Sequence, residues 1–285
     1  MILLDGGGDA VAGLARNRRG PLRTGGLSPI LVTMASPPPS HGAALSATGL
    51  AKSYGSTPVL EGIDLAVTAG AAFGLVGLNG AGKTTLIKCM LDFCSVDSGS
   101  IHIFGVSHTV PAARARLSFV PERFVPPHYL TSLEFMKLAF SLAGRPYNDD
   151  RVSLLFDELG LERTALPRPV RQLSKGMTQK LGLAGCFVVD RDLYLLDEPM
   201  SGLDPASRVA VKSVIARLTS EKRTLFFTSH VLADVEELCS SIAVLDSGRI
   251  RFAGSPRELC ERFGEPQLER AFLSCINDAH RPAIA

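Results

Sequence analysis

A glycine-rich loop with a single lysine, residues 77–84 reading GLNGAGKT, limits what this chain can fold into more than any other feature. The apolar run 72–77 before it is typical of a buried strand, and the pattern 83–91 after it is typical of a helix. The spacing GxxxxGK followed by Ser or Thr, placed between a strand and a helix, is that of a phosphate-binding loop. Its glycines let backbone N–H groups point at phosphate oxygens, and the helix adds its positive end.

The side chains of this loop have distinct expected roles. We expect Lys83 to reach the β- and γ-phosphates of a nucleotide and the Thr84 hydroxyl to bind Mg²⁺. A glycine-rich turn with an exposed lysine is the plainer interpretation, but the strand and helix on either side argue against it. The loop residues expected to bind nucleotide are Gly77, Leu78, Asn79, Gly80, Ala81, Gly82, Lys83, Thr84 and Thr85.

A second apolar run ends in two acidic residues. Residues 193–199 read LYLLDEP, which predicts a strand that carries Asp197 and Glu198 to the carboxyl edge of a sheet, beside the phosphate loop. Asp197 is suited to hold Mg²⁺, directly or through water, and Glu198 is suited to polarise an attacking water as general base. Together the two motifs predict a nucleotide triphosphatase.

Composition excludes several other classes. Of the 285 residues, 46% are hydrophobic and 20% charged, which is ordinary for a globular protein, and the net charge of +2 predicts no nucleic-acid partner. The six cysteines form no CxxC pair and no zinc-type spacing with histidine, which favours a reducing, cytoplasmic setting. No apolar run approaches the roughly 18 residues of a membrane span. If a membrane is involved, another chain crosses it.

The chain divides into a tail, a core and an insertion. Residues 1–45 are rich in Gly, Pro, Ser and Ala and are expected to be a disordered extension. Arg18 and Arg19 faintly resemble a twin-arginine export signal, whose apolar patch is interrupted here, and Met34 is an alternative start. Residues 44–68 predict antiparallel edge strands, and 114–190 a mostly helical insertion with proline breaks. After it, strands at 193–196, 224–228 and 242–245 alternate with helices at 205–218 and 231–238, which indicates a parallel sheet covered by helices.

Further segments resemble the motifs of the ABC ATPase family. Residues 173–177 read LSKGM and resemble its LSGGQ signature, and residues 201–204, SGLD, match its D-loop. His230 matches its switch histidine, and Tyr54 matches the aromatic residue that stacks on adenine. Each match has a plainer interpretation: a structural histidine, a packed tyrosine, or helix starts capped by Ser174 and by Asp204 before a proline. The order and spacing of all the motifs favour the family, and the resemblance extends over residues 46–272.

The resemblance implies a fold and an assembly. It implies an α/β, P-loop NTPase (RecA-like) mixed-sheet core with an N-terminal antiparallel β subdomain and an inserted α-helical subdomain. The cassette would span 46–260, its helical subdomain about 115–190, and a short C-terminal extension 261–285. Ser174 and Gly176 would contact an ATP held by a second ATPase subunit, identical or related, with Asp204 relaying between two head-to-tail sites. ATP and Mg²⁺ are the implied ligands. A separate transmembrane permease subunit would hold the dimer at the cytoplasmic face of the cell membrane.

Two departures from the family pattern refine the expectation. In the segment 119–124, which reads FVPERF, Glu122 stands where the family has a glutamine. We expect Glu122 to take part in catalysis or to ligate Mg²⁺. Lys175 and Met177 replace the signature's glycine and glutamine, and Lys175 either adds charge near the second phosphate site or points to solvent. Glu122 and the tail 252–276 resemble the exporter-type (ABC-2-like) branch. A membrane-docking groove is expected at 122–140, with Phe124, Val125, Tyr129, Leu130 and Phe135, although core packing explains any one of them equally well.

Two rival functions remain. A soluble, non-transport ABC ATPase of translation or DNA repair would share every motif above, but the translation type carries two cassettes and the repair type a long coiled coil, and this sequence has one cassette without sustained heptads. A P-loop kinase or GTPase has no need of the LSKGM segment or of His230.

Overall fold

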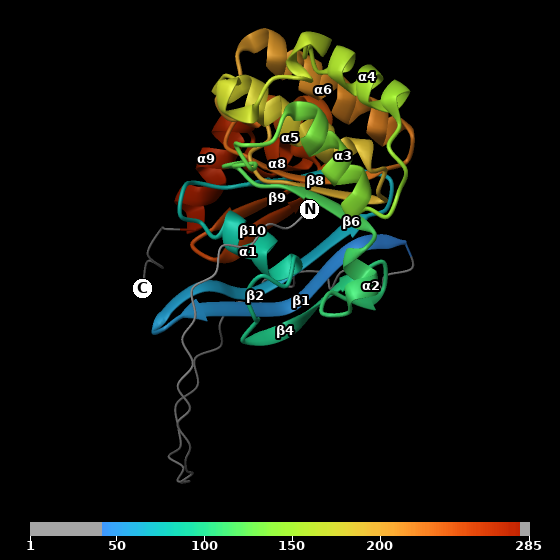
Figure 1. The fold of residues 1–285 in the computed structure, drawn as a ribbon. Helices are drawn as coiled ribbons and strands as arrows, with labels where there is room; N and C mark the ends of the chain where they lie inside the picture. The colour runs from blue at the N-terminus through green and yellow to red at the C-terminus, as the bar shows by residue number, and fades with distance from the viewer. Residues whose placement is uncertain (1–41, 280–285) are drawn as a thin grey trace, which may run out of the picture.

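The computed structural model describes residues 42–279, in which the apolar runs form two sheets separated by one helix (Figure 1). The larger sheet is mixed, with only its last strand, β10, antiparallel to its neighbour. Across the sheet the strands are β10 (Arg249–Gly254), β9 (Ser241–Asp246), β3 (Ala72–Val76), β8 (Thr224–Ser229), β7 (Leu193–Leu196) and β6 (Leu117–Val120). The expected α/β fold with a mixed sheet is confirmed.

The register of this sheet gathers several loops at one edge. Val76 of β3 lies opposite Ser229 of β8, and Leu196 of β7 lies opposite both Phe227 of β8 and Val120 of β6. Because these four strands are parallel, the segments that follow them all leave from the same, carboxyl edge. The glycine-rich loop, the acidic pair and His230 are therefore brought to one place.

The smaller sheet is antiparallel and lies on the far side of α1 from the helical layer (Figure 1). Its strands, in order, are β2 (Thr57–Thr68), β1 (Ala43–Tyr54), β4 (Ser98–Ile103) and β5 (Val106–Ser107), followed by the short helix α2 (Pro111–Arg114). The turn residues 55 and 56 separate β1 from β2, and these two strands pair antiparallel, as expected for residues 44–68.

The helices form two groups. Helix α1 (Lys83–Met90) lies between the two sheets, where its buried Leu86, Ile87 and Met90 belong to the same apolar cluster as residues of both sheets. Apart from α2, the other helices and helical turns pack on the opposite face or at the end of the large sheet. These are α3 (Ser132–Leu142), α4 (Asp149–Glu158), the 3-10 turns Arg163–Ala165 and Val170–Gln172, α5 (Lys175–Val188), α6 (Pro205–Ser220), α7 (Leu232–Leu238), α8 (Pro256–Phe263) and α9 (Leu268–Ala279).

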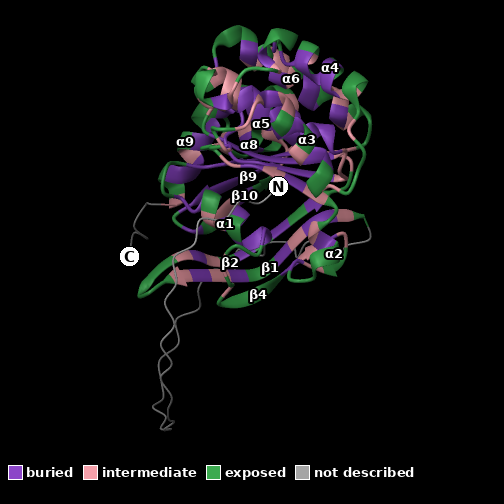
Figure 2. Ribbon diagram, viewed as in Figure 1, coloured by how far each residue is buried: buried purple, intermediate pink, exposed green. Residues whose placement is uncertain are grey.

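Burial follows this layering (Figure 2). The strands β3, β7 and β8 are buried on both faces, so β3, β7 and the middle of β8 (residues 225–227) are continuously apolar rather than alternating. Full burial of a side chain such as Leu86 or Phe226 contributes about 1.5–3 kcal/mol. This rigid sheet fixes the loops at its carboxyl edge.

Three sequence expectations need correction. The strand β1 begins at Ala43, so residues 43–45 belong to the sheet and not to the N-terminal extension. Residues 117–120, assigned to the helical insertion, form the strand β6. The sequence did not reveal this strand, because four residues carry too little periodicity and the partner strand lies far away in sequence. The strands β4 and β5 were not expected at all. The expectations for residues 1–41, including Arg18, Arg19 and Met34, lie outside the described residues.

Candidate active site

The phosphate loop joins β3 to α1 and is shaped by glycines that cannot be replaced freely. A Cβ on Gly77 would lie 2.3 Å from the carbonyl oxygen of Leu245, which leaves no room for any side chain. Gly80 and Gly82 have φ of 84° and 110°, in the left-handed region that glycine adopts at little cost. Nothing lies within 4 Å of the Cβ position of Gly80. The loop is thus closed on the sheet side and open on the other.

The first turn of α1 presents backbone N–H groups that have no partner within the helix. Gly82 is the N-cap of α1 and makes no side-chain capping bond. The first N–H groups of a helix have no partner within the helix, so such an end favours an anion. An open glycine cradle over an uncapped helix start fits the phosphates of a nucleotide.

Lys83 is held inside the loop that it closes. Its Nζ donates to the carbonyl oxygens of Gly77 at 2.7 Å and Leu78 at 3.4 Å, and lies 3.8 Å from Glu198 Oε1. The side chain is buried although it carries a charge. Burial of an ammonium group is costly unless it is paired, so these three oxygens fix its position at the centre of the loop.

Asp197 links the acidic strand to the phosphate loop. Thr84 Oγ1 donates to Asp197 Oδ2 at 2.9 Å, and Thr228 Oγ1 donates to Asp197 Oδ1 at 2.7 Å. The backbone N–H of Asp197 donates to the carbonyl oxygen of Val120 at 2.9 Å, which ties it to the end of β6. Asp197 is 2% exposed, so its carboxylate is oriented by these bonds rather than by water. A hydroxyl and a carboxylate oxygen side by side are ligands that suit Mg²⁺.

Glu198 reaches the same place through an unusual backbone conformation. Consecutive side chains of a strand point to opposite faces, yet Asp197 contacts Thr84 while Glu198 contacts Lys83. The φ of Glu198 is 48°, and this left-handed conformation turns the chain as it leaves β7. Its N–H donates to Thr228 Oγ1 at 2.8 Å, which holds the turn.

His230 completes the cluster from the end of β8. Its Nδ1 lies 2.8 Å from Glu198 Oε2, where a protonated Nδ1 donates to the carboxylate. The histidine side chain is 56% exposed whereas that of Glu198 is 9% exposed, so the pair runs from solvent into the site. Such a pair can orient a carboxylate toward a water molecule.

Sequence reasoning missed Thr228. This residue accepts from Glu198 N, donates to Asp197, and so holds both carboxylates in one arrangement. The available signal was a hydroxyl residue directly after the apolar run 225–227, on a strand expected to neighbour the acidic one.

Glu122 is not joined to this cluster. It follows β6 at the same sheet edge, but its side chain is exposed and makes no hydrogen bond or ion pair within residues 42–279. Its roles in catalysis and in Mg²⁺ binding therefore remain predictions. Its neighbours Pro121 and Arg123 line the same cavity as Thr84 and Asp197.

The signature segment and the D-loop lie at helix starts. Ser174 is the N-cap of α5, with its Oγ accepting from Met177 N at 3.2 Å, and Asp204 caps α6 by accepting from Ser207 N at 2.9 Å. Hydrogen bonds from the side chain and backbone of Ser207 lower the pKa of Asp204. Among the described residues neither Ser174 nor Gly176 is hydrogen-bonded to the phosphate loop.

Lys175 extends over the D-loop. The side chain is exposed, and its Nζ lies 3.4 Å from the position that a Cβ on Gly202 would take. Its charge therefore lies close to its own chain's SGLD segment.

Tyr54 lies near the phosphate loop with its ring half-exposed. The Lys52 ammonium group lies 5.4 Å from the ring centre. Burial of the hydroxyl and hydrogen bonding to Cys94 raise the pKa of Tyr54, whereas hydrogen bonding to Thr85 lowers it. The contact with Thr85 connects this aromatic residue to the first turn of α1. An exposed ring at this position is available for stacking.

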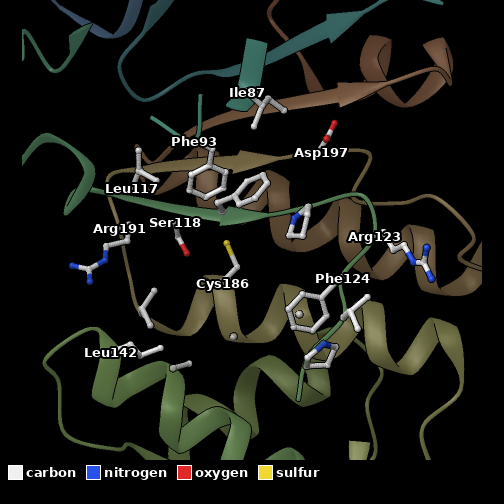
Figure 3. Close-up of a pocket in the computed structure, with 18 of the residues that line it drawn as sticks. Ile87, Phe93, Leu117, Ser118, Arg123, Phe124, Leu142, Cys186, Arg191 and Asp197 are labelled. Carbon is white, nitrogen blue, oxygen red and sulfur yellow. The ribbon is translucent and has the colours of Figure 1, made fainter. Parts of the chain in front are cut away.

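A cavity of about 720 Å³ opens beside the cluster, between the end of the large sheet and the helical layer (Figure 3). Ile87 and Phe93 lie along one side of it, and Phe124 and Leu142 along the other. Of the five apolar residues expected to form a groove here, Phe124 and Val125 line the cavity. Phe135 is fully buried and belongs to the core, and Tyr129 is 75% exposed outside it.

Comparisons with known proteins identify the family. The sequence model described as "ABC transporter" matches residues 60–201. An uncharacterized ABC transporter ATP-binding protein of Synechocystis is 38% identical over 70% of this chain and 57% of its own length. The Nod factor export ATP-binding protein I of Ralstonia nicotianae is 35% identical over 75% of this chain and 68% of its own length.

A solved structure agrees with the sequence relatives. The structure of an ATP-binding subunit of an ABC transporter superposes with a TM-score of 0.75 and 29% identity, and the match covers 81% of this chain and 99% of that one. The mixed sheet, the phosphate loop and these matches have one explanation. This chain belongs to the ABC transporter family of ATP-binding proteins.

Proposed function

We propose that this chain binds and hydrolyses ATP as the nucleotide-binding subunit of an ABC transporter. The cluster of Thr84, Asp197, Thr228, Glu198 and His230 carries the proposal, because it joins the phosphate loop to two buried carboxylates by hydrogen bonds of 2.7–2.9 Å. One carboxylate next to a hydroxyl suits a metal ion. The other, next to a histidine, suits a general base.

Each residue of the site has a proposed role. The loop 77–85 and Lys83 bind the phosphates, Tyr54 stacks on the adenine, and Thr84 and Asp197 hold Mg²⁺. Mg²⁺, when bound, neutralises charge on the phosphates during transfer to water. Glu198 accepts a proton from the attacking water, and His230 keeps that carboxylate oriented. Glu122 contributes to ordering water or metal from the end of β6.

Removing the Thr84 hydroxyl tests the metal site. In Thr84→Val, we expect the gain in affinity that Mg²⁺ gives to a fluorescent ATP analogue to be roughly tenfold smaller than in the wild type. A metal ligand is lost while the glycine cradle is kept. Affinity in EDTA should be unchanged. Fluorescence titrations with Mg²⁺ and with EDTA measure both.

Thr48→Val is the matched control, since Thr48 lies exposed on β1, away from the loop. It should retain the full effect of Mg²⁺. An unaltered Mg²⁺ effect in Thr84→Val would remove Thr84 from the metal site.

The proposed assembly is a head-to-tail dimer. Ser174 and the backbone of Gly176 stand at the start of the 14-residue helix α5, without a bond to their own phosphate loop. A helix start of this kind favours an anion, and the γ-phosphate of an ATP on a second chain, identical or related, supplies one. Asp204 lies at the start of α6 in position to connect the two sites. ATP then stabilises the dimer and its hydrolysis releases it.

A separate transmembrane permease is the second proposed partner, with the chain peripheral to the cytoplasmic face of the membrane. No helix in the described part of the chain is long and apolar enough to span a membrane. The cavity of Figure 3 is the proposed docking site, because it lies between α1 and the helical layer and most of the side chains that line it are apolar. The name of the Ralstonia relative supports export as the direction.

A charge in this groove tests the docking. Val125 is 68% exposed at the groove, and Val125→Asp should strongly lower the fraction of full-length chain that sediments with native membranes, because the carboxylate would have to be desolvated on binding. Purified Val125→Asp should keep its ATPase rate.

Leu154→Asp is the control, because Leu154 is 55% exposed on α4 and lies outside the groove. It should sediment with membranes like the wild type. Equal loss in both variants would argue against docking at this groove, and absence of the wild type from membranes would favour the soluble alternative.

A further inference from the structure

Two cysteine side chains face each other beside the proposed nucleotide site. Cys89 lies in the last turn of α1 and Cys94 in the turn that follows, and their sulfur atoms are 3.5 Å apart. Both are free thiols, and all six cysteines lie within the described residues. No other two cysteine sulfurs there are in contact. A disulfide needs a separation of about 2.05 Å, so each sulfur must move by only about 0.7 Å.

The chain between the two residues favours this movement. The N–H of Asp92 donates to the carbonyl of Cys89 at 3.0 Å, and that of Phe93 to the carbonyl of Lys88 at 2.9 Å, which ends the helix and folds the chain back. Asp92 has a φ of 59°, in the left-handed conformation that ends many helices. The turn therefore holds Cys94 against the helix that carries Cys89.

The two thiols differ in accessibility. Cys89 is buried, and burial raises the pKa of its thiol to about 12, so it remains protonated and unreactive alone. Cys94 is half-buried and can be reached from solvent. This is the arrangement of an attacking thiol beside a resolving one.

The pair is connected to the nucleotide site on both sides. Cys89 shares α1 with Lys83 and Thr84, and Cys94 lies close enough to the hydroxyl of Tyr54 to raise its pKa, which Thr85 lowers. A bond between the sulfurs would draw Cys94 away from Tyr54 and toward α1. Tyr54, the residue proposed to stack on adenine, would lose its neighbour Cys94 and keep Lys52 and Thr85 beside it.

We propose that Cys89 and Cys94 form a reversible disulfide that weakens ATP binding. The oxidant is hydrogen peroxide: the Cys94 sulfur attacks one peroxide oxygen and forms a sulfenic acid as the O–O bond breaks, and the departing hydroxide takes the thiol proton and leaves as water. The Cys89 sulfur then attacks the Cys94 sulfur, its proton passes to the departing hydroxide, and a second water leaves. Two thiols are oxidised and one peroxide is reduced. The inference rests on the proposed nucleotide binding.

Peptide mapping of the full chain tests the bond itself. Trypsin cleaves after Lys88 and Arg114, so both thiols fall within the single peptide 89–114. After treatment with a small excess of hydrogen peroxide, this peptide should lose the mass of two hydrogen atoms and become resistant to N-ethylmaleimide, and dithiothreitol should reverse both changes. Cys89→Ser and Cys94→Ser should form no such species, while Cys260→Ser should behave as the wild type. A peptide that stays reduced or acquires only oxygen overturns the proposal.

Fluorescence titration with an ATP analogue tests the consequence. Oxidation should weaken binding by about fivefold in the wild type and in Cys260→Ser, and should change nothing in Cys94→Ser. By linkage, saturating ATP should raise the midpoint potential of the cysteine pair by about 20 mV, because a fivefold difference in ATP affinity between the reduced and oxidised forms corresponds to that shift for a two-electron couple. A disulfide that forms without changing affinity overturns the coupling. Loss of binding in both redox states instead contradicts the proposed function, and the peptide map still reports on the bond.

Discussion

Glutamine in place of Glu198 is expected to lower the rate of ATP hydrolysis by about 10²- to 10⁴-fold while ATP binding persists. The substitution keeps the shape of the side chain, so the turn held by Thr228 and the contact with His230 can remain. It removes the negative charge that accepts the proton of the attacking water. The loop 77–84 and Lys83, which are proposed to bind the phosphates, are untouched.

The same variant should accumulate as an ATP-bound dimer. Because ATP is proposed to hold two chains together until it is hydrolysed, slow hydrolysis prolongs that state. Size-exclusion chromatography with light scattering should give about twice the mass of one chain with ATP and Mg²⁺, and a single chain with ADP. Glu236→Gln, an exposed glutamate of α7, is the control and should hydrolyse ATP normally. Normal hydrolysis by Glu198→Gln would remove Glu198 as the base.

The phosphate loop and the sheet could be predicted because their signals are local. The spacing of the glycines, Lys83 and Thr84 is contiguous in sequence, and the run 193–196 is apolar throughout, as a strand buried on both faces requires. The strand at 193–196 and the helices near 205–218 and 231–238 are confirmed to within a few residues.

What could not be predicted depends on partners distant in sequence. The strand β6 has four residues, and only its pairing with β7, more than 70 residues away, makes it part of the sheet. Thr228 matters because the fold places it between the two carboxylates, a relation that no spacing along the chain expresses. The left-handed conformation of Glu198 is likewise imposed by the turn after β7.

Two expectations concern assembly and remain predictions for a physical reason. Ser174 and Asp204 already cap helices in the single chain, so their geometry is satisfied without a second subunit. Glu122 is exposed and unbonded within the described residues, as a residue that meets its ligand only in a complex would also be. The contacts within one chain therefore agree equally with a helix-capping role and with a role in a nucleotide site shared between two subunits.

Alanine in place of Lys83 should abolish hydrolysis altogether. The Lys83 ammonium group is buried, held 2.7 Å from the Gly77 carbonyl oxygen, and pre-positioned where the phosphates are proposed to bind. Loss of one such preorganised donor costs about 10²- to 10³-fold in rate, and here it also leaves Glu198 without its nearest cation. Lys88→Ala, on the exposed side of the same helix, is the matched control.

The most direct measurement is phosphate release by the purified wild type, Lys83→Ala and Lys88→Ala in the same assay, with Mg²⁺ and with EDTA. We expect Mg²⁺-dependent hydrolysis in the wild type and in Lys88→Ala, and none above background in Lys83→Ala. Hydrolysis by Lys83→Ala at the wild-type rate would contradict the claim that this loop is the catalytic nucleotide site.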